Sequence, residues 1–356
     1  MEIKMMKTKL GIFFLLGYAL CYPYCAFAGF EDALKAYQEK DYPKAVAEAR
    51  QAASTGDARA SFLLGVMYQG GLGVVASPAE AAALYEKAAQ GGVGGSFSKL
   101  AQIYMRGDGV PKNPEKALAY ARQSALLGDP EGMFLLNIIL KVGSLSYVDA
   151  NGKPDRAKYR QLSVRPLSER TLDAEAQDAL YRSAEKGYPL AIFTLALSFS
   201  GTVGDGNRER MLALTSKIPA HTHKGLQDHE KLARYMNSLG QSLTTTQLFS
   251  DSQVSQMVAA MLKTCGLQGS EETVKNMPEL TGIAIAKPLT GATYLPSTVP
   301  GYEHSYLVAG QWEENWTYKG CGRTATVKVK FSADGLGGAY LFSEQIGKDI
   351  PGLSKQ

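Results

Sequence analysis

Three of the four histidines of the chain stand close together, in a combination that can bind a transition metal. His221 and His223 are two positions apart, and His229 follows between Asp228 and Glu230. A zinc site needs three or four such ligands at about 2.0–2.2 Å from one ion. Two interpretations are open: a metal-binding loop, or a polar linker exposed to solvent. We expect the linker, and therefore predict no metal and no other cofactor.

The cysteines allow either a crosslink or thiol chemistry. Cys21 and Cys25 lie near the N-terminus, whereas Cys265 and Cys321 lie far downstream and are 56 residues apart. Catalytic thiols need a histidine partner, and the sequence signals none near this pair. In an exported chain the second pair is more typical of a structural disulfide. Loop-closure entropy gives such a crosslink a stabilising effect of about 4 kcal/mol.

Aromatic side chains alternate in one segment. Trp312, Glu314, Trp316 and Tyr318 occupy every second position, so on a β-strand they share one face. Two interpretations are open here as well. The aromatic residues form the core of a small sheet, or they form a contact patch for a partner protein, because Trp and Tyr dominate interface hot spots. Trp312, Trp316 and Tyr318 are the candidate partner contacts.

Motifs of known enzyme classes are missing from the sequence. It contains no Gly-x-Ser-x-Gly elbow, no His-Glu-x-x-His segment and no Cys–His pairing that indicates a nucleophile. The glycine-rich segment from Asp334 to Gly338 lacks the Lys-Ser/Thr and the helix of a phosphate-binding loop, so it predicts a hairpin turn. We therefore predict no catalytic residue and a protein that is not an enzyme.

The first 28 residues have the layout of an export signal. Lys4, Lys7 and Lys9 precede an apolar run over residues 10–20, and small residues stand at the −3 and −1 positions of a site ending at Ala28. The run is shorter than the roughly 20 residues that span a bilayer. We predict cleavage after Ala28 and a soluble protein in the periplasm or outside the cell.

Charge and hydropathy limit the classes of partner that the chain after residue 28 is expected to bind. Without residues 1–28 the net charge falls from +4 to +2 over 328 residues, which argues against a nucleic-acid surface. No later stretch is apolar for long enough to cross a membrane. The expected partner is therefore another protein, such as a secreted or envelope enzyme.

An internal repeat organises the first half of the chain. A segment that begins at Ala60 recurs 36 residues later, and a fixed period near this length predicts a solenoid of helix pairs. The predicted packing residues of the two copies are Gly65, Tyr68, Gly71 and Gly73 in the first and Tyr104, Gly107 and Gly109 in the second.

Glycines mark where the helix pairs end. Gly56, Gly92 and Gly128 are evenly spaced, and each is expected in a left-handed conformation after a helix. The next such residue, Gly187, stands 59 positions after Gly128 instead of 36. The excess falls at about residues 148–171, where we predict an inserted loop.

The pattern changes further along the chain. Helices are expected over residues 226–239 and 252–263, and strands over residues 302–308, 311–318, 324–331 and 338–342. The predicted fold is α+β, an N-terminal α-solenoid followed by a small antiparallel β-rich domain. The expected division is a signal peptide (1–28), a solenoid (29–218), linking helices (219–280) and a β-rich domain (281–356) tied by Cys265–Cys321.

The repeat units resemble a known family. Ala60, Leu64, Gly65 and Tyr68 fit the pattern Ala-x-x-x-Leu-Gly-x-x-Tyr of Sel-like repeats, relatives of tetratricopeptide repeats, and Ala101 replaces the family glycine in the second copy. The resemblance implies an adaptor that brings proteins together, in bacteria often in the envelope. Some exported members look like immunity proteins that hold a type VI phospholipase effector inactive in the periplasm, and the arrangement of this chain is similar to theirs.

Three hypotheses for the function follow. The first is a non-catalytic periplasmic interaction module that binds and neutralises a partner enzyme, as an immunity or inhibitor protein against a lipase or phospholipase effector. The second is an envelope scaffold that helps to assemble a secretion or polysaccharide complex. The third is an enzyme or metal protein that uses the segment from His221 to His229.

Overall fold

A computed structural model describes residues 29–144, 155–219, 224–265 and 277–343 of the chain. The predicted signal peptide lies outside these residues. The chain divides into two compact units, with the boundary between Ile139 and Leu140. The sequence-based division puts its main boundary after residue 218 instead. The last helix pair of the predicted solenoid thus belongs to the same unit as the sheet.

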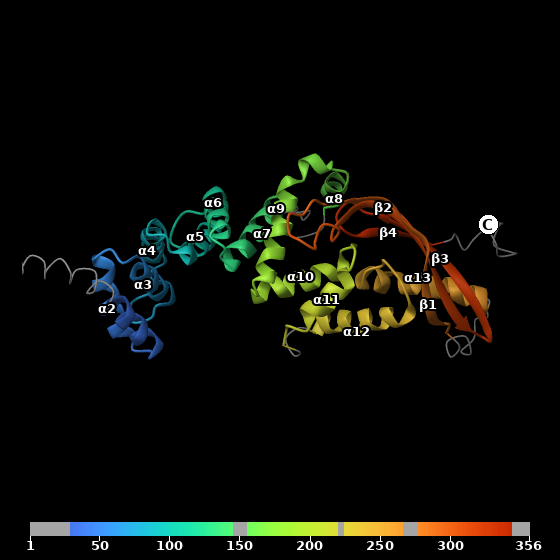
Figure 1. Ribbon diagram of the computed structural model, residues 1–356, viewed down its shortest axis with the longest axis horizontal. Helices are drawn as coiled ribbons and strands as arrows, with labels where there is room; N and C mark the ends of the chain where they lie inside the picture. Colours follow the sequence, from blue (N-terminus) through green and yellow to red (C-terminus); the bar gives the residue numbers. More distant parts are fainter. Residues whose placement is uncertain (1–28, 145–154, 220–223, 266–276, 344–356) are drawn as a thin grey trace, which may run out of the picture. The chain divides into compact units, whose positions relative to one another are not determined.

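The first unit consists of paired helices. A helix over residues 29–38 is followed by α2 (Tyr42–Ser54), α3 (Ala58–Gly70), α4 (Pro78–Gln90), α5 (Gly94–Arg106), α6 (Pro114–Leu126) and α7 (Pro130–Ser144), which crosses the boundary (Figure 1). Helices α3 and α5 begin 36 residues apart, and so do α4 and α6. The predicted helical repeat is confirmed.

Local signals fix where these helices begin. The side chain of Ser77 accepts a hydrogen bond from the backbone N–H of Glu80 at 3.3 Å, and Pro78 is the first residue of α4. Asn113 does the same for Lys116 at 2.9 Å before α6. Such N-caps satisfy backbone donors that have no partner in the helix.

The ends follow the predicted glycine pattern. Gly56, Gly92, Gly128 and Gly187 have φ angles of 93°, 81°, 81° and 82°, in the left-handed region where glycine is favoured. After each of them the next backbone N–H bonds back to the last turn of the helix; that of Val93, for example, reaches the carbonyl of Ala88 at 3.0 Å. These are Schellman motifs, which satisfy the orphan carbonyls.

The predicted insertion is not simply a loop. Its described part contains helix α8 (Arg156–Ser163) and the short 3₁₀ helix η1 (Leu167–Glu169), and helix α9 (Thr171–Glu185) starts at its end. Asp155 caps α8 by accepting hydrogen bonds from the N–H groups of Ala157 and Lys158, which explains why a polar segment forms a helix here. Residues 145–154 lie outside the described residues.

The second unit continues with four helices and ends in a sheet. Its further elements are α10 (Pro189–Gly201), α11 (Asn207–Thr215), α12 (Lys224–Leu239), α13 (Thr246–Thr264), β1 (Glu279–Tyr294), β2 (Leu307–Gly320), β3 (Arg323–Ala333) and β4 (Ala339–Ser343) (Figure 1). The strands form one antiparallel sheet in the order β1-β2-β3-β4. The predicted helical region followed by a small antiparallel sheet is confirmed.

Two strand predictions need correction. Residues 302–306 are not part of a strand, and β2 begins only at Leu307. The ring of Tyr302 stacks on Tyr181 with 4.0 Å between centroids, so a tertiary contact holds it outside the sheet. The 16-residue strand β1 was not predicted as a strand. Most of β1 is exposed and it contains Pro288, which weakens the strand signal.

The loop before β2 joins the sheet to the helices of the second unit. The Asp178 carboxylate on α9 accepts hydrogen bonds from the Ser297 hydroxyl at 2.6 Å and from the Thr298 N–H at 2.8 Å. The Leu307 N–H donates to the carbonyl of Val203, after α10, at 2.9 Å. These contacts make the last helix pair and the sheet one compact unit.

Candidate protein-interaction surfaces

The family glycine of the first repeat makes room for a tyrosine. A Cβ atom built on Gly65 of α3 would come within 2.8 Å of the ring of Tyr85 on α4, and Tyr85 is fully buried. In the second repeat Ala101 and Ala121 stand at the two equivalent positions, and both are fully buried. The replacement of glycine by Ala101 is therefore matched by loss of the large ring opposite it.

The second glycine of each loop brings neighbouring repeats together. A Cβ on Gly73 would lie 2.6 Å from the backbone of Tyr42, at the start of α2. One on Gly109 would lie 2.4 Å from the backbone of Ala79, at the start of α4. Only glycine permits this approach. Gly71 and Gly107, the other predicted loop glycines, also have positive φ angles, of 65° and 83°.

The repeated tyrosines link one helix pair to the next through their hydroxyl groups. Arg50 on α2 donates from Nη2 to the hydroxyl of Tyr68 at 2.7 Å. One period later the Tyr104 hydroxyl donates to Oε1 of Glu86 at 2.9 Å. Burial and this bond raise the pKa of Tyr104 to about 12. Arg50 and Glu86 occupy equivalent positions, 36 residues apart. The hydrogen-bond partner of the repeat tyrosine is thus a cation in one repeat and an anion in the next.

A groove lies beside the first of these tyrosines, where α2 meets the loop between α3 and α4. Its apolar wall contains Val46, Val74 and Val75, and Arg50 and Tyr68 line it as well. Val75 is 88% exposed, the largest fraction among the large exposed hydrophobic side chains of the described residues. We call this set of five residues the valine–arginine groove. It offers apolar surface next to a guanidinium group.

The alternating aromatic residues lie in the core of the second unit. Trp312, Trp316 and Tyr318 are 1%, 0% and 3% exposed. The ring of Trp316 lies 5.0 Å from that of Phe249 on α13, so this face of the sheet is covered by a helix. The structure contradicts the contact-patch interpretation, because these side chains do not reach the surface.

Glu314 lies on the same face as these rings, as the alternation of the sequence predicts, but its role follows only from the structure. Its carboxylate is fully buried and accepts hydrogen bonds from the indole nitrogens of Trp312 at 3.1 Å and Trp316 at 2.9 Å. The Ser242 hydroxyl and the Leu243 N–H, from the segment between α12 and α13, also donate to it. Glu314 therefore fixes the sheet to the helical part of its unit.

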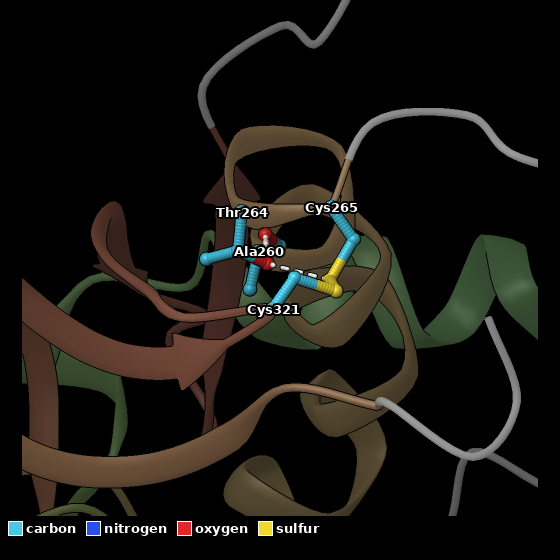
Figure 2. The surroundings of a disulfide bond; sticks show 4 residues. All are labelled: Ala260, Thr264, Cys265 and Cys321. Atoms are coloured by element: carbon cyan, nitrogen blue, oxygen red, sulfur yellow. Dashed lines mark hydrogen bonds between the residues drawn. A yellow bond between two sulfur atoms is a disulfide. The ribbon is translucent and has the colours of Figure 1, made fainter. Parts of the chain in front are cut away.

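The predicted disulfide is present. Cys265 caps the C-terminal end of α13, and Cys321 lies in the turn between β2 and β3, with 5.4 Å between their Cα atoms (Figure 2). Next to the bond the Thr264 hydroxyl donates to the carbonyl of Ala260 at 2.8 Å (Figure 2). A disulfide is consistent with an extracytoplasmic location, because the cytosol keeps thiols reduced.

The histidine cluster is described only in part. His221 and His223 lie outside the described residues. Nδ1 of His229 is 3.0 Å from the hydroxyl of Thr246, and burial lowers the pKa of His229. In the part of the chain that the structure describes, no three His, Cys, Asp or Glu side chains gather as a metal site would require.

In the described part of the chain, no helix is both long enough and apolar enough to cross a bilayer.

The helical repeat of the first unit matches a known family of repeats. Residues 58–93 and 98–129 match the Sel1 repeat. The chain contains two Sel1 repeats. Repeats of this family generally act as scaffolds for protein–protein interaction. The two matched segments contain all seven predicted packing residues, from Gly65 to Gly109.

Two solved structures resemble this chain. A Sel1 repeat protein from Oxalobacter formigenes is 32% identical, with 24% of this chain and 65% of that chain covered and a TM-score of 0.24. The protein c5321, a protective antigen present in uropathogenic Escherichia coli strains with an SLR fold, is 21% identical, with 70% of this chain and 59% of that chain covered and a TM-score of 0.37. The chain thus spans about three fifths of their length. No curated protein is similar enough to count as a match.

Proposed function

We propose that this Sel1 repeat protein is a non-catalytic interaction module of the cell envelope, and that the valine–arginine groove binds an extended segment of a partner protein. The observation that carries the proposal is the groove itself. It lies where α2 meets the loop of the first matched repeat, and it places an exposed valine beside an exposed arginine. Repeats of this family generally serve protein binding.

The chemistry of the groove indicates what the segment contains. Val74 and Val75 offer surface to an apolar side chain, which gains free energy by leaving water. Arg50 is held in place through its bond to Tyr68, so its guanidinium is ready to bind a carboxylate in a bidentate manner. A segment in which an apolar residue stands near an Asp or Glu fits both features.

The more specific proposal is that binding neutralises a secreted or envelope enzyme, such as a type VI phospholipase effector. The predicted export signal and the Cys265–Cys321 disulfide support a location where such enzymes act. Inhibition by binding needs no reactive group on the inhibitor. The sequence contains no motif for a nucleophile or a general base, which is compatible with inhibition by binding alone.

The test is affinity capture from an envelope extract with residues 29–356 as bait, in three forms. These are the wild type, Arg50→Glu in the groove and Arg106→Glu as a matched control. The Arg106 side chain is 61% exposed near the C-terminal end of α5 and does not line the groove. We expect the wild type and Arg106→Glu to retain one protein in stoichiometric amount, and Arg50→Glu to lose it. Equal capture by all three forms, or by none, would overturn the proposal.

The same experiment separates inhibitor from scaffold. If the captured protein is an enzyme, its activity is measured with one equivalent of the bait, and loss of activity supports neutralisation. Capture of several components of one secretion or polysaccharide complex, with activity unchanged, favours the scaffold. In either case Arg50→Glu is expected to abolish the effect.

A further inference from the structure

Strand β4 is an edge of the sheet and carries exposed aromatic side chains. It pairs with β3 on one side, where Lys330 lies opposite Phe342 and Ser332 opposite Tyr340. On its other side no strand follows among the described residues. Tyr340 and Phe342 are 47% and 56% exposed. Because they are two residues apart on a strand, both point to the same side of the sheet.

The two edges of the sheet differ in how they are protected against pairing. β1 contains Pro288 and Lys287, has several register shifts against β2, and bridges Gly240 through Ile283. Proline, lysine and bulges are the usual means by which proteins prevent edge-to-edge association. β4 has the sequence Ala-Tyr-Leu-Phe-Ser, without a charge or a proline. Among the described residues, nothing pairs with this edge, so a further strand can add to it there.

The hairpin before β4 holds this edge in position. Buried Arg170 donates from Nη1 to the carbonyl of Gly335, and the Tyr306 hydroxyl donates to the carbonyl of Leu336 at 2.6 Å. The Asp334 carboxylate accepts a hydrogen bond from the Leu336 N–H at 2.7 Å. An edge that is already ordered loses little conformational entropy when another strand binds to it.

We propose that β4 pairs with β4 of a second copy of this chain, antiparallel and centred on Leu341. In this register each Tyr340 lies opposite the second copy's Phe342, and each Phe342 opposite its Tyr340. Aromatic residues directly opposite each other are among the favourable cross-strand pairs. The strand is thus complementary to itself, and the two four-stranded sheets become one continuous sheet.

Charge also fits a second copy. β4 has no charged residue, so self-pairing brings no like charges into opposition. Lys330 lies opposite Phe342 on β3, one strand away from the new interface. The two copies' Lys330 side chains are then separated by three strand spacings, about 14 Å. This exceeds the Debye length of about 8 Å at physiological ionic strength, so their repulsion is largely screened.

The first test is the oligomeric state of residues 29–356, measured by sedimentation over a range of concentrations. We expect a monomer–dimer equilibrium for the wild type. Phe342→Lys puts a charge into the interface opposite an aromatic ring and shifts the protein to monomer. Leu190→Lys on α10, where the side chain is 54% exposed, is the matched control and dimerises as the wild type does. A wild type that stays monomeric throughout, or a Phe342→Lys protein that still dimerises, would overturn the proposal.

The second test determines the register in which the two β4 strands pair. Tyr340→Cys chains are mixed with Phe342→Cys chains under mild oxidation, and each variant is also oxidised alone. We expect the mixture to form more crosslinked dimer than either variant alone, because position 340 faces position 342 of the other chain. Equal crosslinking in all three samples rules out this register. Neither test involves the valine–arginine groove, so failure here leaves the proposed function standing and the reverse also holds.

Discussion

Gly65 lies so close to Tyr85 that a Cβ at position 65 would come within 2.8 Å of the tyrosine ring. In the next repeat both positions are alanine. The two repeats thus pack the same pair of positions differently, one with glycine and a large ring, the other with two small side chains.

This relationship predicts a coupled pair of substitutions. Gly65→Ala overpacks the contact and is expected to cost about 1–3 kcal/mol of stability in the first unit. Tyr85→Ala leaves a cavity and costs about 3–5 kcal/mol. The double variant restores the Ala–Ala arrangement of Ala101 and Ala121, so it should cost clearly less than the sum. Chemical denaturation of the four proteins measures the coupling, and strictly additive costs would contradict it.

Glu314 is predicted to stabilise the fold of the second unit. Glu314→Gln replaces one acceptor oxygen with a donor group, which leaves buried N–H or O–H groups without an acceptor and costs about 1–3 kcal/mol. Glu313→Gln is the control, because this neighbour pairs at 2.8 Å with Lys287, whose side chain is 66% exposed. Thermal unfolding followed by tryptophan fluorescence should show a far larger loss for Glu314→Gln. Equal losses of stability in the two variants would mean that the hydrogen bonds from the indoles to Glu314 contribute no more than the surface ion pair of Glu313.

The disulfide is expected to stabilise only the second unit. Reduction, or the Cys265→Ser/Cys321→Ser variant, removes a crosslink with a sequence separation of 56 residues and should cost about 4 kcal/mol there. The first unit contains no cysteine in its described residues and should unfold as before. Calorimetry with and without a reductant measures the unfolding transition of each unit separately. A shift of both transitions, or of neither, disagrees with this assignment.

Acid is predicted to weaken the second unit through His229. Burial lowers its pKa, so the folded state favours the neutral ring. The contribution to stability is present above the pKa of the unfolded chain, about 6.5, and is lost as the pH falls through the lower folded value. His229→Gln should flatten the loss of stability below pH 6.5, whereas His304→Gln, at a side chain 63% exposed, should not. An unchanged pH profile in His229→Gln would exclude this cause.

Local signals explain why the helical half could be predicted. Ser77 and Asn113 start helices through bonds within one turn, and Gly92 and Gly128 end them, so neighbouring residues carry the information. The repeat period then places the helices side by side. The disulfide followed from composition alone, because one cysteine pair remains after the predicted cleavage.

Contacts between distant segments explain what the sequence did not show. Tyr302 leaves the predicted strand because it stacks on Tyr181, far away in the chain. Glu314 was placed on the right face, yet its donor Ser242 lies on a segment that periodicity does not connect to the sheet. The valine–arginine groove likewise needs Val75 and Arg50 from different repeat elements. None of these pairings leaves a signal in local spacing.

The most direct test of the central claim is the affinity of the captured partner for three proteins. These are the wild type, Val75→Asp in the groove and Leu126→Asp, whose side chain is 81% exposed elsewhere in the same unit. Isothermal titration should show at least about tenfold weaker binding for Val75→Asp, a loss of about 1.4 kcal/mol, and an unchanged dissociation constant for Leu126→Asp. If the partner binds all three proteins equally, the valine–arginine groove is not where this protein binds it.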